Sequence, residues 1–226
     1  MNRLYYIHDP MCSWCYAFKP VLASLRQQLP DDMEFVALLG GLAPDTNDPM
    51  PEAMRQQLQD TWRRIEIKVP GIEFNHDFWD KWQQTQPRRA TYPACRAVIA
   101  AHSFDFLEMD SPDSHQFENL MIAAIQKAYY QQALNPSDKQ ILITLAETIG
   151  LDRSAFKKVL EAEACQLELD KQIAQSQQMN ARSYPSLVLG ITQNDSKNSS
   201  FWPVSIDYRN AESMLETINM LLEFED

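Results

Sequence analysis

The chain has 226 residues, of which 45% are hydrophobic and 23% are charged, and its formal net charge at pH 7 is −11. These proportions are ordinary for a globular protein, and the length suits one large domain or one domain that carries an insertion. The negative charge argues against nucleic acid as a partner and against docking on an anionic membrane surface, because both need clustered Lys and Arg.

The start of the chain predicts a β–α–β unit. Leu4–His8 is short and rich in aromatic and branched residues, as strands are. Helical spacing of apolar residues follows over Cys12–Leu29, where Pro20 predicts a kink or a short first helix. Met33–Leu39 reads as a second, buried strand that ends at Gly40-Gly41. This order favours a parallel strand pair with a helix across it.

A long helical region then runs from about Pro49 to Met179. Asn135-Pro136 is expected to start one of its helices, and Asp152 to cap the next. The clearest helix has apolar residues at successive helical positions, namely Phe117, Leu120, Met121, Ala124, Ile125 and Ala128.

Strand character returns near the end of the chain. Tyr184–Thr192 and Phe201–Ile206 are the expected strands, and the polar run Gln193–Ser200 between them is an expected hairpin loop. A last amphipathic helix, Ala211–Leu222, follows the N-cap Asn210. The full order is β–α–β, a helical insert, then β–β–α.

The strongest chemical signal is the pair of cysteines in Cys12-Ser13-Trp14-Cys15, placed after a strand and at the start of a helix. The first turn of a helix leaves N–H groups unpaired and carries the positive end of the dipole, so a thiolate there is stabilised. Cys15, one turn later, can displace a mixed disulfide formed on Cys12. We therefore expect Cys12 to attack and Cys15 to resolve.

Other roles for the cysteines have less support. The four cysteines of the chain are too sparse for a disulfide scaffold. A structural zinc site wants four ligands, and Cys95 and Cys165 form no second CxxC. We expect no metal at this pair, and we expect Cys95 and Cys165 to be buried free thiols.

A second signal is Ser183-Tyr184-Pro185, which opens the strand after the insert. Proline at a strand start is common punctuation. In this element order, however, redox proteins of the thioredoxin fold have a cis proline at this position, and it faces the CxxC. The backbone before such a proline can pair with an extended substrate segment. We therefore expect Pro185 to be cis and to belong to the catalytic site.

The sequence resembles the cytoplasmic, FrnE-like group of the DsbA-like family. The resemblance rests on three stretches, Asp9–Phe18 (DPMCSWCYAF), Tyr92–Ala101 (YPACRAVIAA) and Ser183–Leu187 (SYPSL). It implies an α/β thioredoxin fold with a large all-helical insertion. The expected division is 1–48 for the half with the CxxC, 49–179 for the insertion and 180–226 for the half with the cis proline. Periplasmic DsbA oxidases carry Pro-His between the cysteines, so their oxidising power does not carry over to Ser13-Trp14.

Further residues are candidates for the site. Met11, Ser13, Trp14 and Tyr184 are expected to contact substrate, although ordinary packing is an equal alternative for each. His8 is a candidate electrostatic modulator of the Cys12 thiolate, against the plainer reading of a strand-end histidine. Arg88-Arg89 could hold a glutathione carboxylate, but a solvated charge pair is the simpler interpretation.

The expected function is thiol–disulfide exchange, including disulfide isomerisation, on a disulfide-containing protein or a small thiol. No cofactor is required, and glutathione is a candidate recycling thiol or co-substrate. Because no leader-like or membrane-spanning apolar segment is visible, we expect a cytoplasmic protein, and a homodimer is compatible with the pattern. The rivals are a glutathione-dependent transferase or isomerase of small aromatic molecules, as in the kappa-class and hydroxychromene-carboxylate isomerase relatives, and a non-catalytic peptide adaptor.

Overall fold

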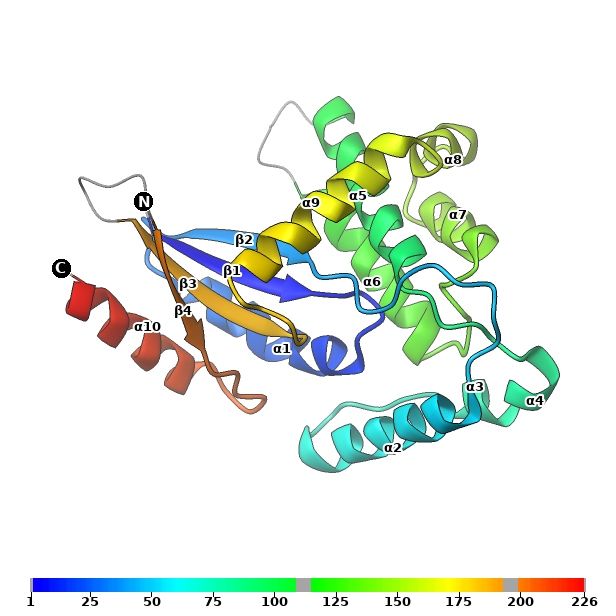
Figure 1. The fold of residues 1–226 in the computed structure, drawn as a ribbon, viewed down its shortest axis with the longest axis horizontal. Helices are drawn as coiled ribbons and strands as arrows, with labels where there is room; N and C mark the ends of the chain where they lie inside the picture. Colours follow the sequence, from blue (N-terminus) through cyan, green and yellow to red (C-terminus); the bar gives the residue numbers. More distant parts are fainter. Residues whose placement is uncertain (1, 109–114, 193–198, 226) are drawn as a thin grey trace. The chain divides into compact units, whose positions relative to one another are not determined.

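A computed structural model describes residues 2–108, 115–192 and 199–225 (Figure 1). These residues form two compact units, of which the first comprises residues 1–40 and 172–226 and the second comprises residues 41–171. The expected division into 1–48, 49–179 and 180–226 stays a prediction. None of the helices in the described part of the chain combines the length and hydrophobicity that a membrane crossing requires.

The first unit is built on a four-stranded mixed sheet in the order β2-β1-β3-β4 (Figure 1). β1 (Arg3–His8) pairs in parallel with β2 (Glu34–Leu39) and antiparallel with β3 (Ser186–Thr192), which in turn pairs antiparallel with β4 (Ser199–Val204). This is the α/β thioredoxin fold that the element order predicts. β4 begins two residues earlier than expected, and residues 193–198 of the expected loop lie outside the described residues.

Apolar residues pack on both faces of this sheet. On one face, α1 (Ser13–Gln27) and α10 (Glu212–Glu225) bury apolar residues such as Phe18, Leu25 and Ile218 against β1 and β3. On the other face, Met179 and Ala181 pack against residues of β1, β2 and β3. Pro20 lies inside α1, which nevertheless runs without a break over its 15 residues to Gln27, so the short-helix alternative was wrong.

The second unit consists of helices and their connections. Its helices are α2 (Glu52–Lys68), α3 (Asp77–Asp80), α4 (Trp82–Thr85), α5 (Tyr92–Glu108), α6 (Gln116–Tyr130), α7 (Lys139–Thr148), α8 (Arg153–Leu160) and the first part of α9 (Glu163–Gln178). Trp62 is buried at the centre of an aromatic cluster, with Phe74 and Trp79 at ring distances of 4.8 and 4.7 Å. The helical insertion predicted from the sequence is thus confirmed.

One local prediction in this unit was wrong. α7 begins after Asp138, whose carboxylate accepts the Gln140 N–H, whereas Asn135 makes a separate turn by accepting the Ser137 N–H at 3.2 Å. The helix predicted from the apolar stripe is confirmed as α6, where Met121 is fully buried and Leu120 is 40% exposed. The cap at Asp152 is confirmed, because its carboxylate accepts the Ala155 N–H at 2.7 Å.

Candidate active site

The end of β1 and the start of α1 bring the two cysteines together. A tight turn links β1 to α1. In this turn, the Asp9 carboxylate accepts the Met11 N–H at 2.8 Å, and the Asp9 carbonyl accepts the Cys12 N–H at 3.0 Å. Cys12 is the N-cap of α1 and has an extended backbone, with φ −85° and ψ 117°. Cys15 lies in the first helical turn, so the local sequence alone creates the pair.

The groups around the two thiols shift their pKa values in opposite directions. The side chain of Cys15 donates to Cys12, and the N–H groups of Cys15 and Trp14 donate as well, which lowers the pKa of Cys12 despite burial and the nearby Asp9. Burial, followed by the donation to Cys12, raises the pKa of Cys15 well above that of an ordinary thiol. Cys12 is therefore the thiol that ionises first. It is also the more accessible of the two, at 6% exposure against 1% for Cys15.

The loop before β3 lies opposite Cys12. The peptide bond between Tyr184 and Pro185 is cis, as the sequence predicted. The Cys12 Sγ donates to the Tyr184 carbonyl at 3.4 Å. Ser186, the next residue, pairs with Ile7 near the end of β1. The antiparallel pairing of β3 with β1 is what places the proline loop beside the cysteine pair.

Gly40 gives Tyr184 its position, a role that the sequence analysis did not find. The Tyr184 hydroxyl donates to the Gly40 carbonyl at 2.7 Å. A Cβ atom at Gly40 would lie 2.0 Å from Cε1 of Tyr184, so only glycine leaves room for this ring. The Gly40 N–H in turn donates to the His8 carbonyl at 2.7 Å, which extends the pairing of β1 with β2. A glycine that ends a strand gives no sequence signal for such a distant contact.

Two tyrosines beside the cysteines were also missed. Tyr6 shares a side-chain hydrogen bond with Cys15, and its pKa is raised well above the ordinary value, chiefly by burial. Tyr208 packs against Trp14 and Phe18, with ring centroids 4.9 and 5.8 Å apart. Burial and the two nearby thiols also raise the pKa of Tyr208. Both tyrosines thus lie close to the two thiols.

The remaining site candidates are placed as follows. Met11 and Ser13 are buried, so of the four expected substrate contacts only Trp14 and Tyr184 are partly exposed. His8 is also buried and stacks on Tyr6 with ring centroids 4.9 Å apart. Its role as an electrostatic modulator stays a prediction.

Four other candidates belong to the second unit. Cys95 and Cys165 are both buried free thiols, as expected, and burial raises the pKa of Cys165. Arg88 donates to the Ser137 carbonyl at 2.6 Å and to Asn47, while Arg89 donates to the Tyr129 hydroxyl at 3.2 Å. Both arginines thus make internal contacts within this unit.

The sequence of the chain is similar to a known protein family and to two curated proteins. A family model described as a DSBA-like thioredoxin domain matches residues 6–213. Two curated relatives, both named ClpXP adapter protein SpxH, are each 22% identical to 94% of this chain. One is from Bacillus subtilis and the other from Halalkalibacterium halodurans. The chain spans 66% and 67% of their lengths, about two thirds.

Solved structures share the fold over the whole chain. A candidate protein disulfide isomerase from Nitrosomonas europaea is 25% identical, with a TM-score of 0.75 and coverage of 100% of this chain and 99% of that one. The cytosolic disulfide reductase DsbM from Pseudomonas aeruginosa, solved with GSH, is 20% identical. Its TM-score is 0.68, over 97% of this chain and 99% of that one. The likeness to DsbM shows the fold alone.

Proposed function

The chain belongs to the DSBA-like thioredoxin domain family, and on that premise we propose that it is a thiol–disulfide oxidoreductase with Cys12 as attacking and Cys15 as resolving thiol. The observation that carries the proposal is the placement of Cys12. This residue caps α1, receives a hydrogen bond from Cys15 and faces the Tyr184 carbonyl before the cis proline. One side chain thus combines a lowered pKa, a resolving partner and an adjacent backbone acceptor.

The reaction proceeds in two exchanges. The Cys12 thiolate attacks a substrate disulfide, a bond forms between Cys12 and one substrate sulfur, and the other leaves as a thiolate that takes up a proton. Cys15 then loses its proton and attacks the Cys12 sulfur, which forms the Cys12–Cys15 disulfide and releases the second substrate thiolate. The substrate disulfide gains two electrons and the cysteine pair loses two. In the reverse direction, the oxidised pair oxidises a dithiol.

The substrate is a disulfide-containing protein or a small thiol compound. Tyr184 offers a backbone carbonyl beside Cys12, to which an extended peptide could bind. Two molecules of glutathione would return the oxidised pair to the dithiol and leave as glutathione disulfide. The GSH bound to DsbM, and the cytosolic setting in that protein's name, support glutathione recycling and a cytoplasmic location. We also keep the assignment to the FrnE-like group and the isomerase activity as parts of this proposal.

An adaptor role is the second candidate, because the curated relatives are named as ClpXP adapters. An adaptor would bind its partner without using the thiols. A glutathione-dependent transferase is the third candidate, but it has no need for a resolving thiol. The buried contact of Cys15 with Cys12 therefore favours exchange over both.

Substitution of the cysteines separates these functions. In an insulin-reduction assay with glutathione, we expect Cys12→Ser to abolish turnover, whereas Cys15→Ser should accumulate a mixed disulfide on Cys12. Cys165→Ser, which removes a buried thiol of the second unit, is the matched control and should retain activity. If Cys12→Ser still reduces insulin, the proposal is wrong. If the unsubstituted protein does not reduce insulin but transfers glutathione to an aromatic electrophile, that result would instead support the transferase function.

A further inference from the structure

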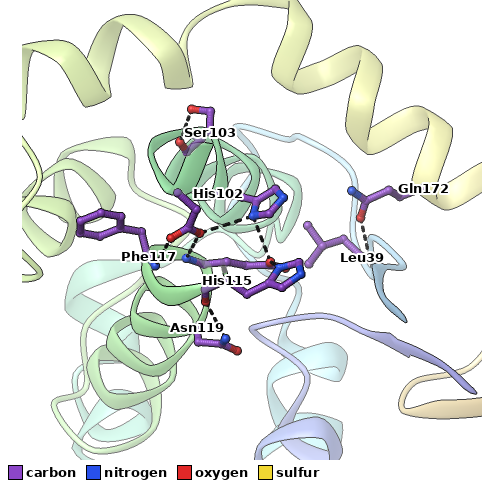
Figure 2. A network of polar contacts seen from close by, with 10 residues as sticks. Leu39, His102, Ser103, His115, Phe117, Asn119 and Gln172 are labelled. Atoms are coloured by element: carbon purple, nitrogen blue, oxygen red, sulfur yellow. Dashed lines mark hydrogen bonds and ion pairs between the residues drawn. The ribbon is translucent and has the colours of Figure 1, made fainter. Parts of the chain in front are cut away.

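Two histidines from different segments of the second unit meet at one carboxylate. His102 lies on α5, and His115 immediately precedes α6. The Nδ1 atoms of both face the same oxygen of Glu118, His115 in direct hydrogen-bond contact at 2.5 Å and His102 at 3.3 Å. Their rings stack, with centroids 4.9 Å apart and an interplanar angle of 6°. Both histidines are labelled in Figure 2.

A second carboxylate holds this cluster in place. Asp105 is fully buried, and its two oxygens accept the N–H groups of Phe117 and Glu118 at 2.7 and 3.2 Å, in the first turn of α6 (Figure 2). One of these oxygens also lies 3.4 Å from Nδ1 of His102. Asp105 and Glu118 thus bring two negative charges to a pair of stacked imidazoles.

This arrangement has the chemistry of a transition-metal site. The ligand atoms of His102, His115 and Glu118 all lie within 4.8 Å of one another. Two imidazoles and a carboxylate form a ligand set that suits Zn²⁺. A divalent cation balances the charges of the two carboxylates and accepts the Nδ1 lone pairs of two neutral rings, whose single protons then lie on Nε2.

We propose that His102, His115 and Glu118 bind a zinc ion, and that Asp105 is the positioning residue that holds the start of α6 against α5. The ion would join two helices that are otherwise linked at this point by ion pairs and one capping carboxylate. With three protein ligands, a water molecule would complete the tetrahedron, and the bound ion would stabilise the second unit by joining these two helices. The site lies entirely within residues 41–171 and involves none of the residues assigned to disulfide exchange.

The test must remove a competing zinc ligand, because a reduced CxxC can itself bind the ion. In this test, the parent protein is therefore the double variant Cys12→Ser/Cys15→Ser. It is stripped of metal with a chelator and titrated with zinc chloride by calorimetry. We expect one ion per chain. His115→Ala and Glu118→Gln should each weaken binding by more than about tenfold, since even outer-shell changes cost about 10–100-fold. His115 is largely exposed, so its substitution should leave the fold intact.

A matched control is His76→Gln, which removes a histidine that, within the described residues, is paired with a single carboxylate, Glu66, at 3.1 Å. This variant should bind zinc as the parent does. Zinc should raise the melting temperature of the parent and of this control, but not that of His115→Ala. Cobalt bound to the parent should show visible d–d absorption without a thiolate charge-transfer band.

Two results would overturn the proposal. One is a parent that binds no zinc in the titration, which would leave only ion pairs at this cluster. The other is unchanged zinc affinity in both His115→Ala and Glu118→Gln, which would place any bound ion elsewhere.

Discussion

The Sγ atom of Cys12 lies 3.4 Å from the carbonyl oxygen of Tyr184, the residue before the cis proline. In the thiol form, Cys12 donates its proton to this carbonyl. When Cys12 ionises, the donor is lost and the helix N–H groups with the Cys15 thiol take over its stabilisation. We expect the Tyr184 carbonyl then to be available to a substrate backbone, which would couple ionisation to substrate binding at this contact.

The pKa of Cys12 depends on Cys15. Cys15→Ala removes the side-chain donor that most strongly favours the Cys12 thiolate, so the pKa of Cys12 should rise. The rate of Cys12 alkylation by iodoacetamide, followed against pH by mass spectrometry, should shift its midpoint upward. Cys95→Ala, in the second unit, should leave the midpoint where it is. An unchanged midpoint in Cys15→Ala would contradict the proposed hydrogen bond.

The stability of the dithiol form should depend on pH through the same thiol. The folded-state pKa of Cys12 is lowered, so its ionisation contributes stability that is full above the unfolded value of about 8.5. This contribution is lost as the pH falls through the folded pKa. The raised pKa of Cys15 acts oppositely, with its contribution full below about 8.5 and lost as the pH rises through the folded value.

Urea unfolding under reducing conditions can isolate the Cys12 contribution. The free energy of unfolding of the unsubstituted protein, minus that of Cys12→Ser, should grow with pH between the folded pKa of Cys12 and about 8.5. A difference that stays flat or falls over this window would show that the thiolate is not stabilised in the folded protein.

Gly40→Ala should disrupt the proline loop. The new methyl group would lie 2.0 Å from the Tyr184 ring, and overpacking of this kind costs about 1–3 kcal/mol of stability. Displacement of Tyr184 should also lower the exchange rate, because its carbonyl faces Cys12. Tyr184→Ala should partly rescue the stability of Gly40→Ala in a double-mutant cycle measured by urea unfolding. Fully additive losses would argue against the direct clash.

Trp14→Ala should weaken the binding of protein substrates. Trp14 is partly exposed beside the thiols and packs on Tyr208, so it offers an apolar contact to an extended chain. We expect KM for a disulfide-containing protein to rise several-fold, while the rate with a small disulfide changes little. Tyr208→Phe retains the ring and should behave as the unsubstituted protein does. Equal effects on both substrates would place Trp14 in the chemistry rather than in substrate binding.

The parts of this protein that the sequence predicted are those with short-range signals. The spacing from Cys12 to Cys15, the strand before it and the proline at the start of β3 are each confined to a few residues. The β–α–β and β–β–α order then leads to the thioredoxin fold, which the structure confirms.

The parts that were missed depend on contacts between distant segments. Tyr184 and Gly40 are 144 residues apart, and nothing near either residue indicates that one ring fills the space of a missing side chain. Tyr208 meets Trp14 only because α10 and the segment before it return to α1. The start of α7 was misplaced because Asn135 makes its own turn, a competition between two side-chain caps that spacing does not decide.

The most direct test of the central claim is an equilibrium titration of the Cys12–Cys15 pair against reduced and oxidised glutathione, read by thiol labelling and mass. We predict a reversible two-electron transition between dithiol and disulfide that is absent from Cys15→Ser. The midpoint would also give the preferred direction of exchange. A pair that forms no disulfide at any glutathione ratio would contradict the assignment of Cys12 and Cys15 as a redox pair.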